Sequence, residues 1–155
     1  MKIMLDEGAL MPTRAHTYDA GLDLYAPVDV TIPGSEAKMV YDPDLRTTKY
    51  EVLAGTAVID TGVHVQIPEG CYGEIRSRSG LMVNHSITTD GTIDCGYTGP
   101  IKVKLFNHSN SDYKVRSGDK IAQLVIVPCV LLPIEKVDSF GKTDRGANGF
   151  GSTGR

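Results

Sequence analysis

The chain has 155 residues, of which 41% are hydrophobic and 23% are charged, a composition typical of one globular domain with a modest core. The formal net charge of −3 provides no basic face, so we expect no binding to nucleic acid. We expect no signal peptide in the opening stretch MKIMLDEGALMPTRAH and no membrane span, because every apolar run is too short. Three scattered cysteines, Cys71, Cys95 and Cys129, indicate reduced thiols and a cytoplasmic location.

Short apolar or alternating runs, rich in Val and Ile, recur along the chain and are separated by Gly, Pro, Asn and Asp. In chain order they cover residues 22–27, 28–33, 62–68, 101–107 and 121–134. This pattern is typical of an all-β sandwich or barrel. Helical periodicity is nearly absent, and the only helix we expect is a turn or two from Ser79 to Asn84. The last fifteen residues form a Gly-rich segment without strand character.

The segment RSRSGL (residues 76–81) has the residue types of an anion site. Arginine offers a planar fork for phosphate oxygens, Ser79 offers a hydroxyl, and Gly80 lets a backbone N–H group approach closely. A helix beginning at Gly80 would also place its partial positive charge beside the anion. The alternative interpretation is a polar strand end with a capping serine, and the residues alone leave both open.

The run DGTIDCGYTGPIKVKLFN (residues 90–107) is the most informative part of the sequence. Its glycines predict a tight, hairpin-like connection between two strands, from which Asp94 and Tyr97 project. A carboxylate beside phosphates can orient and deprotonate a water molecule, and an aromatic ring can stack on a sugar or base. The alternative is an ordinary turn aspartate and an edge tyrosine.

Two further segments carry polar groups. RSGDKIAQL (residues 116–124) predicts a turn and then a strand, in which Gln123 is either a satisfied core group or a donor to a ligand. GFGSTG (residues 149–154) matches the dinucleotide pattern G-x-G-x-x-G, but no helix follows it in this sequence, so we expect no Rossmann site. A loop that wraps an anion with its N–H groups and hydroxyls is the alternative. The four histidines show no metal-ligand spacing.

Five segments now stand in order. They are AGLDLYA (20–26), RSRSGL (76–81), GTIDCGYTG (91–99), RSGDKIAQL (116–124) and RGANGFGSTG (145–154). Together they resemble the five ordered motifs of the trimeric dUTPases, over a stretch that runs from about Pro12 to the C-terminus. The resemblance implies a distorted jelly-roll, or β-barrel, over residues 1–140, with an insertion at about 35–55 and a mobile Gly-rich lid at 141–155.

The same resemblance implies an activity and an assembly. The activity is Mg²⁺-assisted hydrolysis of dUTP to dUMP and pyrophosphate, which keeps uracil out of DNA and supplies dUMP for thymidylate synthesis. The assembly is a homotrimer with its active sites at subunit interfaces. The Gly-rich tail then becomes a lid that a bound triphosphate orders over a neighbouring subunit.

The resemblance also implies a role for each matching residue. Asp94 matches the aspartate that activates the attacking water, and Tyr97 matches the ring that packs under deoxyribose and excludes a 2′-hydroxyl. Asp23 matches a carboxylate that acts on Mg²⁺ through water. The other implied substrate contacts are phosphate ligands at Arg78, Ser79, Gly80 and Gln123, uracil-edge groups at Thr92 and Ile93, Lys102 near the substrate, and lid residues Arg145, Phe150, Gly151, Ser152 and Thr153.

The sequence departs from the family pattern in two places. The insertion contains MVYDPDLRTTKYEVL, which predicts a surface hairpin with a Pro-Asp turn. Thr88 stands where many bacterial relatives have asparagine, so a substrate contact there is in doubt. Two other functions compete with dUTP hydrolysis: a dCTP deaminase of the same fold, and a trimer that binds a regulatory protein through the insertion. Asp94 with Tyr97 favours hydrolysis.

Overall fold

The computed structural model describes residues 1–147. Within them the chain forms thirteen strands and one helix. The elements are β1 (Lys2–Leu5), β2 (Gly21–Tyr25), β3 (Val30–Ile32), β4 (Glu36–Asp42), β5 (Thr47–Leu53), β6 (Gly55–Asp60), β7 (Val63–Gln66), β8 (Cys71–Arg76), α1 (Ser79–His85), β9 (Ile87–Thr88), β10 (Asp90–Ile93), β11 (Lys102–Asn107), β12 (Tyr113–Val115) and β13 (Lys120–Pro128).

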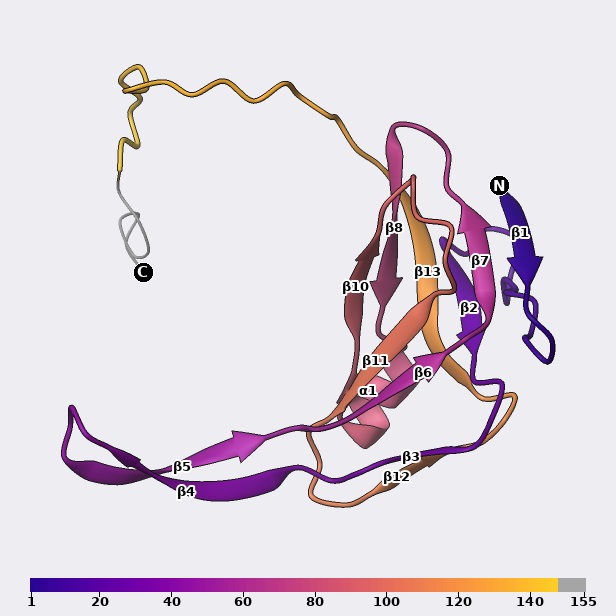
Figure 1. Cartoon of the computed structure of the whole chain (residues 1–155), viewed down its shortest axis with the longest axis horizontal. Coiled ribbons are helices and arrows are strands. Elements are labelled where there is room, and N and C mark those ends of the chain that lie inside the picture. Colours follow the sequence, from indigo (N-terminus) through magenta and orange to yellow (C-terminus); the bar gives the residue numbers. More distant parts are fainter. Residues whose placement is uncertain (148–155) are drawn as a thin grey trace.

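The strands form a barrel of several small antiparallel sheets (Figure 1). The largest sheet has the order β10-β8-β13-β2, and a second has the order β6-β11-β9. The pairs β1-β7 and β12-β3 complete the barrel. The predicted all-β fold of distorted jelly-roll type is confirmed, and so is the short helix, which begins at Ser79.

One apolar core lies between the sheets, and alternation along the strands builds it. In β11 the side chains of Val103 and Leu105 are each 1% exposed, whereas those of the alternating Lys102 and Lys104 are exposed to solvent. This is the period of two expected for a strand with one buried face. The other fully enclosed members include Leu24, Ile32, Ile59, Ile87, Ile101, Ile121 and Leu124.

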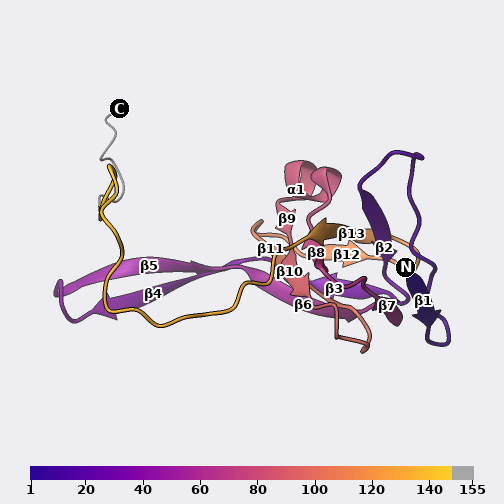
Figure 2. The same ribbon diagram turned by 90° about the horizontal axis from the view of Figure 1, so that it is seen from above.

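The insertion forms a hairpin, β4-β5, which projects away from the barrel (Figure 2). Its register places Met39 opposite Tyr50, and both side chains are exposed. At the Pro-Asp turn, the carboxylate of Asp42 accepts hydrogen bonds from the backbone N–H groups of Asp44 and Leu45, both at 3.1 Å. The pKa of Asp42 is lowered, chiefly by the hydrogen bond from Leu45. The predicted surface hairpin with its Pro-Asp turn is therefore confirmed.

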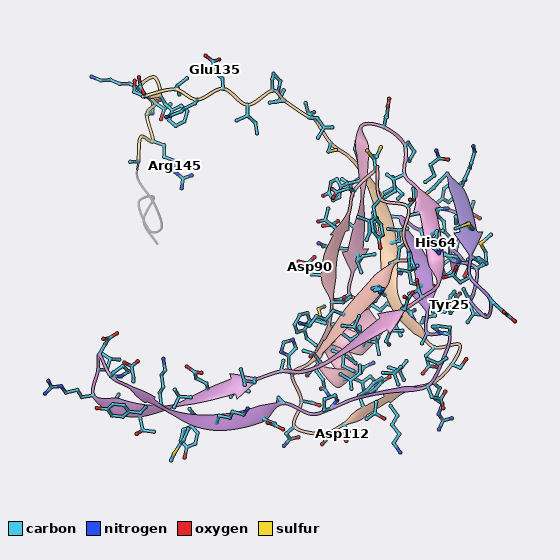
Figure 3. All side chains as sticks on the ribbon, viewed as in Figure 1. Tyr25, His64, Asp90, Asp112, Glu135 and Arg145 are labelled. Atoms are coloured by element: carbon cyan, nitrogen blue, oxygen red, sulfur yellow. The ribbon has the colours of Figure 1, made fainter. Side chains whose placement is uncertain are left out.

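The predicted strand at residues 121–134 is too long. Strand β13 ends at Pro128, and residues 130–147 are exposed along a segment that runs away from the barrel. Figure 3 shows Glu135 and Arg145 on this segment. Its apolar residues, such as Leu131 and Ile134, suit a strand, but no other strand of the described chain pairs with them.

The connection from β10 to β11 also differs from expectation. It is not a hairpin, because β10 pairs with β8 whereas β11 pairs with β6 and β9. Gly96 and Gly99 instead lie in a connection that passes from one sheet to the other. The division of the chain at residue 140 stays a prediction. No helix in residues 1–147 is long and apolar enough to cross a membrane.

Candidate active site

A buried carboxylate with basic partners lies where β2, β13 and the end of β8 meet. Asp23 is only 2% exposed, and it lies opposite Gln123 in the register of β2 and β13. The ammonium of Lys120 lies 2.7 Å from its Oδ2, and the Nε atom of Arg78 lies 3.4 Å from its Oδ1. The amide of Gln123 donates to Oδ1 at 3.3 Å. A charge this deeply buried needs such partners to offset its lost hydration.

The same cluster borders a cavity of about 470 Å³. Arg78, Gly80 and Lys120 line it, together with residues of α1 and β12. Arg78 occupies the N-cap position of α1 without a capping hydrogen bond from its side chain, and Ser79 is the first helical residue. No serine side chain therefore caps α1, contrary to that part of the alternative interpretation. The predicted anion segment lines this cavity, with Lys120 beside it.

A second, smaller cavity of about 210 Å³ lies beside the connection from β10 to β11. It is lined by Thr92, Ile93, Asp94, Tyr97, Pro100 and Lys102. Asp94 is exposed, and its carboxylate makes no hydrogen bond or ion pair with the part of the chain that the structure describes. The prediction that Asp94 and Tyr97 project from one connection is confirmed.

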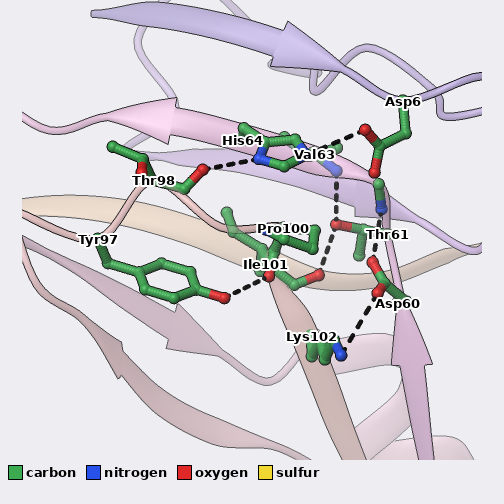
Figure 4. Close-up of polar contacts among 11 residues, drawn as sticks. Asp6, Asp60, Thr61, Val63, His64, Tyr97, Thr98, Pro100, Ile101 and Lys102 are labelled. Carbon is green, nitrogen blue, oxygen red and sulfur yellow. Dashed lines mark hydrogen bonds and ion pairs between the residues drawn. The ribbon is translucent and has the colours of Figure 1, made fainter.

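Tyr97 is held in place by the chain that follows it. Its hydroxyl donates to the carbonyl oxygen of Pro100 at 3.0 Å (Figure 4). A Cβ atom at Gly99 would lie 2.5 Å from that hydroxyl, so only glycine lets the ring fold back over the backbone here. Lys102, at the start of β11, pairs with Asp60 at 3.7 Å, which keeps its ammonium at the edge of the cavity.

Two polar residues, one in the turn between β6 and β7 and one in β7, contact this connection. The hydroxyl of Thr61, which is buried, donates to the carbonyl oxygen of Ile101 at 2.8 Å. In β7, His64 contacts the carbonyl oxygen of Thr98 through Nδ1 at 2.7 Å and Asp6 through Nε2 at 3.1 Å. The carbonyl of Thr98 is the main cause of a raised pKa at His64, burial opposes it, and Asp6 and Asp60 add to it.

Sequence reasoning missed Lys120, Thr61 and His64 as parts of the site. The available signals were local. Lys120 stands three residues before Gln123, and His64 occupies a polar position of the alternating run GVHVQIP. Neither signal identifies a partner, because Asp23 and Asp6 are distant in the sequence.

The structure brings the predicted residues together in two groups and not in one. Asp23, Arg78, Ser79, Gly80 and Gln123 lie around the junction of β2, β13 and α1. Thr92, Ile93, Asp94, Tyr97 and Lys102 line the smaller cavity, and no residue lines both cavities. Arg145 is exposed on the segment beyond β13, and Phe150, Gly151, Ser152 and Thr153 lie outside the described residues.

The residues present fit a magnesium ion only indirectly. Within residues 1–147, no three His, Cys, Asp or Glu side chains are grouped to hold a metal ion. Asp23 is no free ligand, because Lys120 and Arg78 already contact its two oxygens. Its carboxylate therefore suits a metal reached through water. Thr88, whose role was in doubt, shares a hydrogen bond of 2.8 Å with His108.

Comparison with known proteins now decides the family. The dUTPase family model matches residues 41–154, which is well over half of the chain. This protein belongs to the dUTPase family. The family and class of enzyme predicted from the sequence are thereby confirmed.

Curated dUTPases match this protein along nearly its whole length. The deoxyuridine 5′-triphosphate nucleotidohydrolase of Gloeothece citriformis is 40% identical over 153 residues, which cover 97% of this chain and 92% of that protein. The protein of the same name from Arabidopsis thaliana is 41% identical over 97% of this chain and 80% of its own length.

Solved structures agree with the sequence comparison. The dUTPase of Staphylococcus bacteriophage 80alpha, solved as a mutant with dUpNHpp, has a TM-score of 0.79 at 28% identity, covering 99% of this chain and 98% of its own. A mutant dUTPase of phage phi11 of S. aureus, described with a structural Mg(II) ion, has a TM-score of 0.70 at 28% identity. It covers 90% of this chain and 97% of its own.

Proposed function

We propose that this protein hydrolyses dUTP to dUMP and pyrophosphate, with water attacking the α-phosphorus. The product chemistry would limit uracil in DNA and supply dUMP for thymidylate synthesis. The observation that carries the proposal is the smaller cavity, where the exposed Asp94 carboxylate and the Tyr97 ring face the same space. A carboxylate without a competing partner can accept a proton from water, which is the work of a general base.

The groups around this cavity suit a deoxyuridine. Strand β10 is an edge strand of its sheet, so part of its main-chain N–H and C=O groups faces away from β8. Groups at Thr92 and Ile93 would pair with the edge of uracil. The Tyr97 ring would lie under the sugar and leave no room for a 2′-hydroxyl, and Lys102 would border the same nucleoside.

The larger cavity supplies what a triphosphate needs. Phosphoryl chemistry depends on positioning and on neutralising charge. Arg78, Ser79, Gly80 and Gln123 would bind the phosphates. Mg²⁺ would be held mainly by phosphate oxygens and water, with Asp23 reached through water, and when bound it neutralises the charge of the phosphates. The lid would add Phe150 over the base, with Arg145, Gly151, Ser152 and Thr153 on the phosphates.

The homotrimer stays a proposal, and this separation of the two cavities supports it. The two cavities share no lining residue, which suits a site whose nucleoside and phosphate contacts come from different copies. We propose that Asp94 of one copy faces Arg78 of another and that a tail closes the site. The cytoplasmic location stays a prediction. The regulatory-protein alternative also stays open, and the exposed Met39–Tyr50 pair is where such a partner would dock.

The test is the release of pyrophosphate by the purified protein with Mg²⁺ and either dUTP, dCTP or UTP. We expect kcat/KM for dUTP to exceed that for dCTP by roughly 10⁴, because a site that pairs with uracil leaves polar groups unmatched against cytosine. UTP should fail through its 2′-hydroxyl. Equal kcat/KM values for dUTP and dCTP, or release of ammonia from dCTP, would overturn the proposal and favour the deaminase.

A further inference from the structure

His64 lies between two groups that can only accept hydrogen bonds. Its side chain is 14% exposed, with Nδ1 at 2.7 Å from the carbonyl oxygen of Thr98 and Nε2 at 3.1 Å from the carboxylate of Asp6 (Figure 4). A neutral imidazole carries one N–H group and can donate to only one of them. The imidazolium donates to both. The geometry therefore selects the protonated form of His64.

The charges around His64 support the same form. Asp6 follows β1 and contacts the ring directly, and Asp60 at the end of β6 adds negative charge. Lys102 lies close to Asp60 at 3.7 Å, and Lys2 of β1 lines a separate cavity of about 380 Å³ that His64 and Thr98 also line. Two carboxylates and two ammonium groups therefore surround His64, and among these four charged groups only the Asp6 carboxylate contacts the ring. The pKa of His64 is raised, first by the carbonyl of Thr98.

The carbonyl that His64 binds belongs to the connection that carries the proposed catalytic groups. Thr98 directly follows Tyr97, and the N–H of Tyr97 donates to the carbonyl oxygen of Asp94 at 3.0 Å, which closes a turn. The contact with Thr98 therefore ties the far end of this turn to β7. Movement at Thr98 would shift both Tyr97 and the turn that presents Asp94.

We propose that protonated His64 is a positioning residue, which holds the connection of residues 94–98 in register with the smaller cavity and makes the activity depend on its charge. The proposal rests on the function proposed above. Loss of the proton leaves one of two acceptors without a donor, so the connection loosens as the pH rises. The expected result is a fall in kcat/KM on the alkaline side that belongs to His64 and not to Asp94.

The first experiment compares the wild type with His64→Gln from pH 6 to pH 9, using kcat/KM for dUTP. At low pH we expect the variant to be slower by roughly tenfold, since small misplacements of reacting groups are costly. At high pH the two enzymes should converge to within about twofold, because wild-type His64 is then neutral too. His16→Gln, at an exposed histidine, is the matched control and should equal the wild type throughout.

A second measurement does not depend on activity. In an NMR titration, the C2 proton of His64 should titrate above the ordinary histidine value of about 6.5, and Asp6→Asn should lower its titration point. Hydrogen exchange of the amides at 95–98 should speed up several-fold in His64→Gln. A variant-to-wild-type ratio of kcat/KM that stays constant with pH, or a His64 titration at or below the ordinary value of about 6.5, would overturn the inference. An inactive wild type would instead count against the proposed function.

Discussion

At the residue scale, two carboxylates of the candidate site have opposite surroundings. Asp23 is buried and contacts Lys120 at 2.7 Å, so its charge is already balanced by the protein. Asp94 is exposed and keeps its oxygens free of contacts with the described residues. A balanced carboxylate organises its neighbours, whereas an unpaired one can take a proton from water. The same residue type therefore suits two tasks at the two cavities.

Replacing Asp94 with asparagine should remove turnover but not folding. We expect kcat to fall by roughly 10²–10⁴-fold, the usual contribution of a general base. The free energy of unfolding should change by less than about 0.5 kcal/mol, because the side chain is exposed and unpaired. Asp90→Asn, at the exposed start of β10, the strand that precedes Asp94, is the control and should keep near-normal kcat. Turnover of the Asp94 variant within a few-fold of wild type would reduce Asp94 to a turn residue.

Gly99 should not tolerate a side chain. In Gly99→Ala the new Cβ would lie 2.5 Å from the Tyr97 hydroxyl, so the ring must leave its contact with Pro100. We expect kcat/KM for dUTP to drop by about 10–100-fold through misplacement of the ring. Gly96→Ala in the same connection meets no atom within 4 Å and is the matched control. Steady-state kinetics that show equal losses for both variants would contradict this account.

At the element scale, the β4-β5 hairpin is an addition that the barrel does not need for its core. None of its side chains is buried, and its charged face is held by Lys49, which lies 3.4 Å from Asp42 and 3.5 Å from Glu51. The two ends of the hairpin come together at the barrel. Gly55 packs so closely against the backbone of Pro33 there that a Cβ atom would overlap the Pro33 carbonyl oxygen. Strands β3 and β6 therefore meet without the hairpin between them.

Replacing residues 36–53 with a short Gly-Ser link should leave the barrel intact. We expect the free energy of unfolding to change by less than about 1 kcal/mol, because the two ends of the hairpin already come together and the new loop is short. Urea unfolding and kcat/KM for dUTP check this. A lower oligomeric mass in light scattering would instead reveal that the exposed Met39–Tyr50 pair lies between subunits, and an unfolded product would show that the barrel depends on the hairpin.

Deleting residues 145–155 should separate stability from activity. The residues of the segment that are described, up to 147, are exposed, so the melting temperature should stay within about 2 °C of the full chain. Both kcat and KM should worsen, since a lid acts on the bound substrate and on the transition state. Thermal unfolding and steady-state kinetics are the measurements. Near-normal turnover of the shortened chain would mean that the tail is no lid.

At the scale of the whole molecule, the proposed trimer would divide the reaction between copies of the chain. The larger cavity is lined by Arg78 and Lys120, and the smaller cavity is lined by Asp94 and Tyr97. A closed, symmetric assembly can bring the first cavity of one copy against the second cavity of the next. The oligomer would then be a condition of activity, beyond any effect on stability.

Mixing two inactive variants tests this directly. Asp94→Asn and Arg78→Ala should each be nearly inactive alone. An equimolar, randomly mixed population of trimers should recover roughly a quarter of wild-type activity per site, because each site then receives an intact Asp94 and an intact Arg78 with that probability. Light scattering of each pure variant should give a trimer mass. No recovery from verified mixed trimers would show that Asp94 and Arg78 act within one chain.

Much of the fold and the family could be predicted from the sequence because both depend on local order. The alternation of apolar and polar residues in β11 predicts that Val103 and Leu105 face the core. The Pro-Asp turn predicts the β4-β5 hairpin because a turn depends on its own residues. The five motifs identified the family from residue types and spacing alone. Residues 129–134 were misjudged as strand because local composition cannot show whether a neighbouring strand exists to pair with them.

Only the tertiary structure decided which of the predicted residues share a cavity. Asp23 meets Lys120 and Gln123 through the pairing of β2 with β13, about a hundred residues apart in the chain. His64 meets Asp6 and Thr98 only because β7 lies between the N-terminal strand and the connection after β10. Such contacts join distant segments across the barrel, and their partners follow from sheet register and packing, which a linear pattern does not contain.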